Sequence, residues 1–279
     1  MTTIATLLRD AVAILAAGSD SAALDAEILL SLALDKPRSY LRAWPDREPV
    51  ADQIERFNAL LQQRHQGAPI AYLTGRREFW SRDFQVTPDV LIPRPETELL
   101  IEISLTLLPK DQPAKLIDLG TGSGIIAITL AKELPNAEVT ATDLSLAALK
   151  IAKHNASEHQ ADRIRFIHSN WFASAPPEKF DLVISNPPYI AENDSHLDQG
   201  DLRFEPRSAL TAPHQGLADI QTLASDARPY LKTGGHLLVE HGYDQEHAVQ
   251  SIFRNLGYDS VQTYKDLSGR PRATYGRNR

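Results

Sequence analysis

Residues 116–124, LIDLGTGSG, decide the fold, because an apolar run ends in three closely spaced glycines and a helix-like pattern follows directly. Glycine tolerates positive φ values and lets the backbone approach a ligand, and the first turn of a helix offers unpaired N–H groups. The order of strand, glycine turn and helix therefore predicts a site for a nucleotide-like or amino-acid-like ligand. A tight turn with a purely structural role is the alternative. The dinucleotide-binding pattern has a glycine where this chain has Ile125, which disfavours NAD.

Strand-like and helix-like segments alternate along the chain from Pro95 onward. The patterns predict strands at 115–119, 138–142, 163–168, 180–185 and 235–240, with helices up to 133, from 145, at 219–231 and at 244–255. Two more β-like runs follow at 260–264 and 272–275. Because crossovers between parallel strands are right-handed and short, such alternation indicates one sheet with helices on its faces. The sequence therefore predicts an α/β fold with a mostly parallel, seven-stranded, Rossmann-like sheet.

Polar and aromatic residues follow the second and third predicted strands. Asp143 comes directly after the strand 138–142, at the carboxyl edge where open α/β sheets bind ligands. Its carboxylate is suited to accept hydrogen bonds from both hydroxyls of a ribose, and an N-cap of the next helix is the structural alternative. After the third strand, Trp171 is suited to cover an adenine face and Asn170 to bond its edge. Core packing explains the aromatic residue equally well.

The fourth predicted strand ends in the motif Asn186-Pro187-Pro188-Tyr189. Two prolines stop the strand, remove two N–H donors and leave carbonyl groups available at the strand edge. The Asn186 side-chain carbonyl and the Pro187 backbone carbonyl can together accept both hydrogens of a planar –NH2 group, on whose flat face Tyr189 can stack. Such an arrangement suits methyl transfer to an amide or an exocyclic amine, with orientation and electrostatics supplying much of the rate. A proline-rich turn without a ligand is the alternative.

The part of the chain before Pro95 shows two different patterns. Residues 1–66 carry apolar residues at spacings of three and four, which predicts a small helical domain with helix starts at Ser21 and Asp52. Residues 67–95 hold short β-like runs broken by glycine and proline, which predicts a β-hairpin linker. The α/β domain then extends over residues 96–279.

The composition limits the classes of function. With 42% hydrophobic and 23% charged residues, the chain of 279 residues is typical of a globular protein. It has no cysteine, which excludes disulfides, thiolate metal sites and a cysteine nucleophile, and no metal site is expected. Its net charge of -7 disfavours a surface that binds nucleic acid through phosphate groups. A signal-peptide pattern and an apolar run of roughly 20 residues are both missing, so a cytoplasmic protein is expected.

These motifs together resemble those of a known enzyme family. The glycine turn, Asp143 and the segment 186–189, in this order and spacing, resemble a class I S-adenosylmethionine-dependent methyltransferase. Four further sequence motifs resemble those of one family in particular, the release factor glutamine methyltransferases called PrmC or HemK. These motifs are PIAYLTG at 69–75, VLIPRPETE at 90–98, FEPR at 204–207 and DLSGR at 266–270. The resemblance covers nearly the whole chain. It implies methylation of N5 of the glutamine in the Gly-Gly-Gln loop of bacterial class I release factors.

The resemblance also implies roles for individual residues. The methyl donor S-adenosylmethionine, which leaves as S-adenosylhomocysteine, is expected to contact Gly120, Thr121, Gly122, Ser123, Gly124, Asp143, Trp171 and Asn186. Asn186, Pro187 and Tyr189 are the expected catalytic residues, and Pro188 joins them in holding the substrate glutamine. At Asn170 the chain departs from the family, which commonly has an acidic residue there. We expect a monomer that docks release factor through residues 1–66, without direct contact to nucleic acid or membrane.

Three other functions stay open from the sequence. A ribosomal-protein glutamine methyltransferase uses the same chemistry, a DNA adenine-N6 methyltransferase presents the same two hydrogens, and a binding module keeps the fold without activity. Residues 191–207 hold five acidic and two basic residues, which favours a basic protein over DNA as the partner. A solvated loop without a partner is the alternative for this segment.

Overall fold

The structure, a computed structural model, describes residues 2–279 as two compact units. The helical unit comprises residues 2–76 together with Asp198–Phe204. The α/β unit comprises Arg77–Leu197 and Glu205–Arg279. In the described residues no helix combines the length and the apolar character that a membrane span requires.

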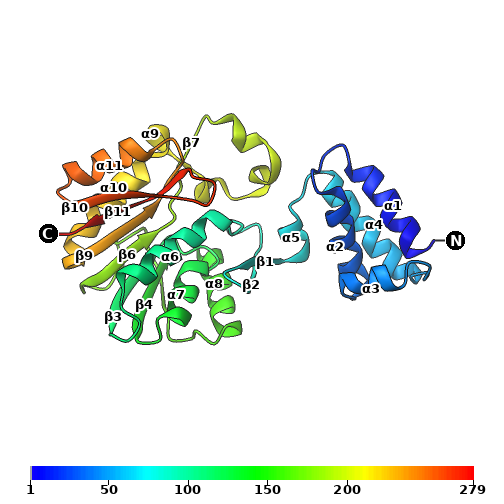
Figure 1. Ribbon diagram of the computed structural model, residues 1–279, viewed down its shortest axis with the longest axis horizontal. Helices are drawn as coiled ribbons and strands as arrows, with labels where there is room; N and C mark the ends of the chain where they lie inside the picture. The colour runs from blue at the N-terminus through cyan, green and yellow to red at the C-terminus, as the bar shows by residue number, and fades with distance from the viewer. Residues whose placement is uncertain (1) are drawn as a thin grey trace. The chain divides into compact units, whose positions relative to one another are not determined.

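The helical unit packs amphipathic helices around a small core, as the spacing of its apolar residues predicts. Leu29, Leu30 and Phe57 are fully buried there. Ser21 immediately precedes the second helix, and Asp52 lies in the first turn of the fourth, close to both predicted starts. The helices, labelled in Figure 1, are α1 (Ile4–Leu15), α2 (Ala22–Leu34), α3 (Arg38–Ala43), α4 (Ala51–His65) and α5 (Ile70–Thr74).

The segment Asp198–Phe204 joins the helical unit although it comes from the middle of the α/β sequence. Gly67 has a φ of +99°, and a side chain there would collide with the guanidinium of Arg203. Arg64 pairs with the buried Asp25 at 2.7 Å and lies 3.8 Å from Asp201. These contacts bind a segment of the predicted loop 191–207 to the helical unit.

The predicted hairpin is formed by β1 (Arg76–Phe79) and β2 (Arg82–Gln85), but it is not a free linker. Phe79 and Phe84 are buried in the core of the α/β unit. The side-chain amide of Asn155 accepts from the backbone N–H of Gln85 at 2.8 Å and donates to its carbonyl at 3.0 Å. The compact units divide at Arg76, and the hairpin packs on the larger unit.

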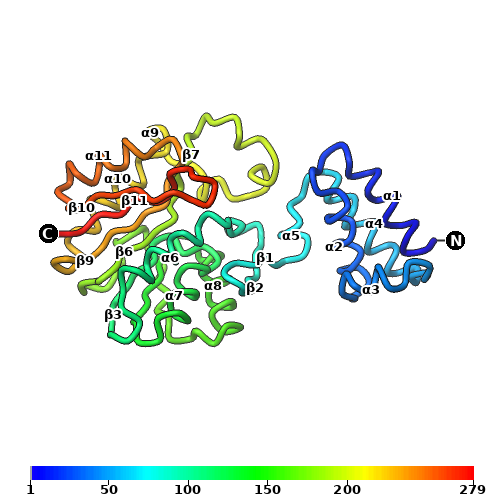
Figure 2. Tube along the Cα trace, viewed as in Figure 1, coloured from blue at the N-terminus to red at the C-terminus, as the bar shows by residue number. Residues whose placement is uncertain are grey.

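The α/β unit confirms the predicted mostly parallel, seven-stranded sheet. The strand order is β10-β11-β9-β6-β3-β4-β5, in which β11 is antiparallel to both of its neighbours and the remaining pairs are parallel. In Figure 2 the green β6 runs beside β9, far from it in sequence. The strands are β3 (Ala114–Leu119), β4 (Ala137–Asp143), β5 (Arg165–His168), β6 (Phe180–Ser185), β9 (Leu231–Glu240), β10 (Asp259–Lys265) and β11 (Pro271–Arg277).

Helices cover both faces of this sheet (Figure 1). On one face, α7 (Ile125–Glu133) and α8 (Leu146–Glu158) pack against β4, and α6 (Glu98–Leu107) packs against β9 and β11. The other face packs α10 (Ala218–Ala227) and α11 (Glu246–Asn255). A short pair, β7 (Ile190–Ala191) and β8 (Thr211–Ala212), and the one-turn helix α9 (Pro213–Gly216) follow β6. The patterns in the sequence predict α7, α8, α10 and α11 but not α6.

The order of the sheet locates its binding edge. The chain enters at β3, adds β4 and β5 on one side, and then crosses to β6 on the other side. Open α/β sheets bind ligands beyond the carboxyl ends of the strands at such a reversal of direction. The glycine turn after β3, Asp143 at the end of β4 and Asn186 after β6 all lie at this edge.

Candidate active site

The glycine turn is fixed by the strand next to it. Gly120, Gly122 and Gly124 have φ values of +72°, +55° and +86°, which residues with a side chain rarely adopt. The backbone N–H groups of Gly120 and Thr121 both donate to the carbonyl of Thr142 at 2.9 Å. A methyl group added at Gly122 would meet no atom within 4 Å, so the backbone there is open to a ligand.

Asp143 points its carboxylate at the glycine turn. One oxygen accepts from the N–H of Gly122 and the other from the N–H of Ser145, both at 2.8 Å. Burial raises the pKa of the Asp143 carboxyl, while these backbone donors oppose the shift. Ser145, not Asp143, caps α8, since its hydroxyl accepts from the N–H of Ala148 at 3.1 Å. The N-cap of α8 is therefore Ser145, and the Asp143 carboxylate, which we expected to bind a ribose, has a different position.

A cavity of about 470 Å³ brings most of the predicted residues together. It lies within the α/β unit, and its size is typical of a small-molecule site. The Trp171 ring approaches the position that a side chain at Gly120 would occupy. The predicted residues that line the cavity are Gly120, Thr121, Gly122, Ser123, Asp143, Asn170, Trp171, Asn186 and Pro188.

Three predicted residues are not part of the cavity lining. A methyl group at Gly124 would lie 2.9 Å from Ile128 Cδ1 and 3.2 Å from Ala152 Cβ, so this glycine permits close packing of α7 on α8. Pro187 is buried. The Tyr189 ring packs partly buried against the core between the sheet and α10, and its hydroxyl donates to Glu240 Oε1 at 3.2 Å.

One end of the Asn186 side-chain amide is hydrogen-bonded within the protein, and the other end is not. Its Nδ2 donates to Thr97 Oγ1 at 3.1 Å. Its Oδ1 is buried and, among the described residues, has no hydrogen-bond partner. Buried carbonyl oxygens nearly always have a donor, so an exception at the edge of a cavity indicates a place where a ligand N–H binds.

The backbone of the motif is braced from two sides. The hydroxyl of Ser185 donates to the carbonyl of Leu119 at 2.7 Å, which ties the end of β6 to β3. The Gln245 Nε2 donates to the carbonyl of Tyr189 at 2.9 Å. Gly216 has a φ of +81°, and a methyl group there would overlap that same carbonyl. These contacts hold the motif rigid, as orientation-dependent chemistry requires.

Thr97 and Glu240 had no role in the sequence analysis, and Glu205 was counted there among the acidic residues of the loop 191–207; the structure places all three around the motif. Glu205 is buried and accepts from the N–H of Ile92 at 2.9 Å and from the guanidinium of Arg94, thereby fixing the cavity wall formed by residues 88–94. Burial raises the pKa of the Glu240 carboxyl to about 7. In the sequence, Thr97 and Glu205 could have been singled out only because they belong to the motifs VLIPRPETE and FEPR.

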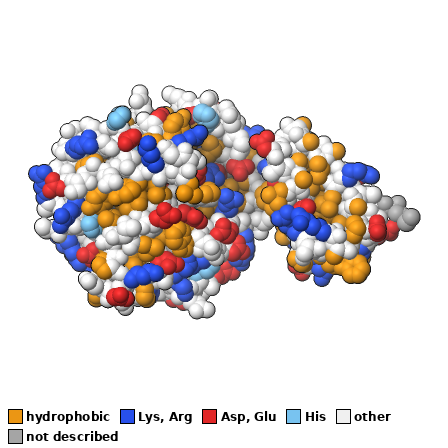
Figure 3. Space-filling view, viewed as in Figure 1, with side chains coloured by type: hydrophobic (Ala, Val, Ile, Leu, Met, Phe, Trp, Pro, Cys, Tyr) orange, Lys and Arg blue, Asp and Glu red, His pale blue; other side chains and the backbone are white. Residues whose placement is uncertain are grey.

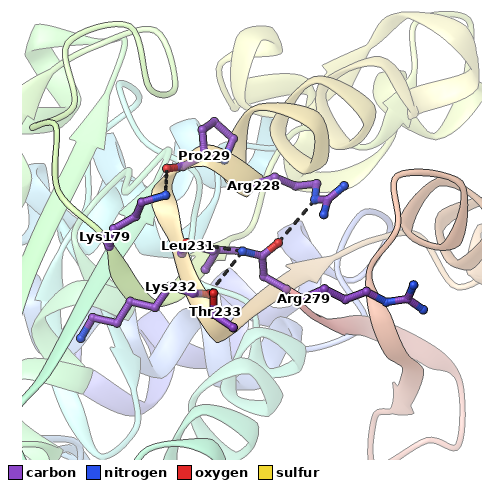
Figure 4. A pocket seen from close by; sticks show the side chains of 8 residues that line it. Lys179, Arg228, Pro229, Leu231, Lys232, Thr233 and Arg279 are labelled. Atoms are coloured by element: carbon purple, nitrogen blue, oxygen red, sulfur yellow. Dashed lines mark hydrogen bonds between the residues drawn. The ribbon is translucent and has the colours of Figure 1, made fainter.

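A second hollow, of about 610 Å³, lies at the opposite edge of the sheet, by the start of β9 (Figure 4). Its polar groups bind one another. The Lys179 ammonium donates to the carbonyl of Pro229 at 2.6 Å. The Asn278 side chain accepts from Arg228 at 3.4 Å and donates to the carbonyl of Lys232 at 3.2 Å. This hollow therefore fastens the C-terminal residues to the sheet.

Two observations bear on the binding of metal ions and of nucleic acid. Within residues 2–279 no group of three or more histidine, aspartate or glutamate side chains is arranged to hold a metal ion. On the face of the α/β unit seen in Figure 3, acidic and basic side chains are interspersed. That face thus lacks the continuous basic stripe that a nucleic-acid backbone requires.

Two family models match the chain. The model described as "PrmC N-terminal domain" matches residues 6–75, and the one described as "Methyltransferase small domain" matches residues 96–202. The first match lies in the helical sequence, and the second covers the glycine turn, Asp143 and the motif at 186–189.

Curated relatives match almost the full chain. A release factor glutamine methyltransferase from Salmonella typhimurium is 48% identical over 260 residues, which is 93% of this chain and 93% of that protein. Proteins of the same name from Shewanella oneidensis and Escherichia coli are 46% and 44% identical, over 94% and 97% of this chain and 92% and 97% of their own lengths.

Solved structures share the fold at low identity. The catalytic domain of hMettl16, solved with an RNA hairpin, is 16% identical with a TM-score of 0.58, covering 78% of this chain and 81% of that one. A methyltransferase from Pyrococcus furiosus is 18% identical with a TM-score of 0.54, covering 79% and 96%. At this identity the likeness concerns the α/β fold.

Proposed function

The chain belongs to the release factor glutamine methyltransferase family, and we propose that it methylates a glutamine side chain of bacterial class I release factors. The acceptor is N5 of the glutamine in the Gly-Gly-Gln loop, and the methyl donor is S-adenosylmethionine. The observation that carries the proposal is the buried, unpartnered Asn186 Oδ1 beside the cavity. This oxygen suits one N–H of a primary amide.

The residues around the cavity fit the proposed methyl donor. Its ribose hydroxyls suit the carboxylate of Asp143, its adenine suits Trp171 and Asn170, and its amino-acid part suits the open backbone at Gly122. When bound, S-adenosylmethionine supplies an electrophilic methyl group on a positively charged sulfur. The family match and the fit of these groups support this choice over NAD, whose binding pattern the chain lacks at Ile125.

The protein's own part in the reaction is to hold the acceptor amide. Asn186 Oδ1 and the Pro187 carbonyl accept the two N–H bonds, which draws the nitrogen lone pair out of resonance and aims it at the methyl group. In the proposed complex the Tyr189 ring, anchored through its hydroxyl, contacts the flat face of the amide. The new N–C bond replaces the bond between the methyl group and the donor sulfur, and the one excess proton left on the nitrogen departs to water. A strong general base is therefore not required.

The helical unit is the proposed docking site for the release factor, because every residue that lines the cavity belongs to the α/β unit. A monomer contains all the groups that the proposed reaction needs. The reaction takes place in the cytoplasm, where release factors act.

The experiment that tests the proposal replaces Asn186 with alanine. We expect Asn186→Ala to lower the single-turnover rate of methyl transfer on the order of 10²- to 10³-fold, the usual effect of losing one preorganised polar contact. Calorimetry should find that S-adenosylmethionine still binds. The exposed Asn193 supplies the matched control, and Asn193→Ala should transfer at the wild-type rate. An Asn186→Ala enzyme that keeps the wild-type rate contradicts the amide-holding mechanism.

A further inference from the structure

We propose that Thr97 and Glu240 are positioning residues that determine which end of the Asn186 amide faces the acceptor. The inference rests on the proposed function and adds two residues to it. Thr97 precedes α6, and Glu240 ends β9, 143 residues away. Both side chains are 1% exposed. Neither lies on a motif to which the sequence analysis gave a chemical role.

The direction of the hydrogen bonds follows from the chemistry of the three groups. Thr97 Oγ1 lies 2.8 Å from Glu240 Oε2, and an ionised carboxylate only accepts, so the hydroxyl gives it its single proton. Thr97 Oγ1 can then only accept from its other neighbour, Asn186, at 3.1 Å. A donor is needed there, and the amide has one only at Nδ2. The NH2 end is therefore held at Thr97.

The opposite end of the amide is thereby left as an acceptor. Asn186 Oδ1 is the buried oxygen that no described residue bonds. If the amide were turned by 180°, an NH2 group would face the NH2 group of the substrate, and neither could accept. A rotated Asn186 would keep its shape and size and lose its function. The Thr97–Glu240 pair removes this ambiguity.

The same carboxylate also fixes the other end of the motif. Tyr189 OH donates to Glu240 Oε1 at 3.2 Å, so both oxygens of Glu240 are used. One buried group thus sets the amide of Asn186 through Thr97 and the ring of Tyr189 directly. A carboxylate suits this task because it accepts from two hydroxyls at once, whereas a neutral amide offers one acceptor and one donor.

Protonation of Glu240 would undo the arrangement. A protonated carboxyl can donate to Thr97 Oγ1, which then no longer needs to act as an acceptor toward Asn186. Burial raises the pKa of Glu240 to about 7, opposed by the hydroxyl of Thr97, the guanidinium charge of Arg272 and the hydroxyl of Tyr189, and reinforced by Glu96. Methyl transfer should accordingly decline as the pH falls below about 7.

Thr97→Val tests the inference, since valine matches the shape of threonine without the hydroxyl. We expect the single-turnover rate on release factor to fall on the order of 10²-fold, with little change in the KM for release factor or the Kd for S-adenosylmethionine. Thr97→Ser restores the hydroxyl and should recover most of the rate. In Glu240→Gln, the decline of the rate below about pH 7 should disappear.

The control is Ser104→Ala, which should leave the rate unchanged. The buried hydroxyl that it removes bonds, among the described residues, only the Leu100 carbonyl inside α6. Thermal melts identify any variant that loses its fold. A folded Thr97→Val enzyme with the wild-type rate, or a Thr97→Ser enzyme no faster than Thr97→Val, overturns the inference. A wild-type protein that fails to methylate release factor overturns the proposed function instead, so the two failures are distinguishable.

Discussion

At the scale of single residues, Asp143 connects the glycine turn to α8 through two backbone donors. We expect Asp143→Ala to weaken S-adenosylmethionine binding by about 1.5 to 3 kcal/mol for each hydrogen bond lost to the charged group. Calorimetric titration measures this loss. Thr3→Ala is the matched variant, because it removes the cap of α1 in the helical unit and should destabilise the protein by about 1 kcal/mol without changing cofactor affinity. Unchanged cofactor affinity in folded Asp143→Ala would assign Asp143 to structure alone.

Single residues were predictable from the sequence where chemistry is concentrated in a few consecutive positions. The glycine turn, Asp143 and Asn186 were each found because they follow a recognisable strand. The roles of Thr97 and Glu240 were not predictable. Their hydrogen bond joins residues 143 positions apart, and no local sequence pattern indicates it. The role of Gly124 was also expected to be contact with the ligand, whereas its neighbours are side chains of α7 and α8.

At the scale of elements, the approach of α7 to α8 depends on Gly124. Gly122→Ala and Gly124→Ala both force a non-glycine residue to a positive φ, which costs about 1 to 2 kcal/mol. Only Gly124→Ala also overpacks against Ile128 and Ala152, at a further cost of about 1 to 3 kcal/mol. Urea unfolding should therefore show a larger loss for Gly124→Ala. Equal free energies of unfolding for the two variants would mean that a methyl group at Gly124 does not overpack the contact between α7 and α8.

The elements that the sequence located are those with a clear period or clear ends. The central strand β6 was predicted at its observed bounds, because an apolar run is closed by two prolines. The helix α6 was missed, since it follows a proline-containing segment and not a predicted strand, unlike α7 and α8. The hairpin β1–β2 was found but interpreted as a linker, because sequence alone does not show that Phe79 and Phe84 are buried.

At the scale of the whole molecule, the two compact units predict separable tasks. An enzyme that lacks residues 1–75 should bind S-adenosylmethionine as the full chain does, because the cavity lies within the α/β unit. We expect its KM for intact release factor to rise at least about tenfold, a loss of about 1.4 kcal/mol of docking energy. A short Gly-Gly-Gln peptide is the control acceptor, whose KM should not change. A folded truncated enzyme with an unchanged KM for release factor would remove the docking role.

The division of the molecule was only partly predictable. Alternating strands and helices indicated the parallel sheet, and the apolar spacing before residue 66 indicated a helical part. The membership of Asp198–Phe204 in the helical unit was not foreseen, because it depends on contacts such as that between Gly67 and Arg203 across a long separation in sequence. Part of the loop after the motif thus belongs to the unit proposed to dock the substrate.

The most direct test of the account offers the protein and labelled S-adenosylmethionine a choice of three acceptors: a class I release factor, a mixture of ribosomal proteins, and adenine-containing DNA. We expect the label on release factor, and fragmentation of the Gly-Gly-Gln peptide should locate one added methyl group on the glutamine side chain. Asn186→Ala, run in parallel over the same short time, should give on the order of 10²- to 10³-fold less label. Label on ribosomal protein or DNA with none on release factor would contradict the account.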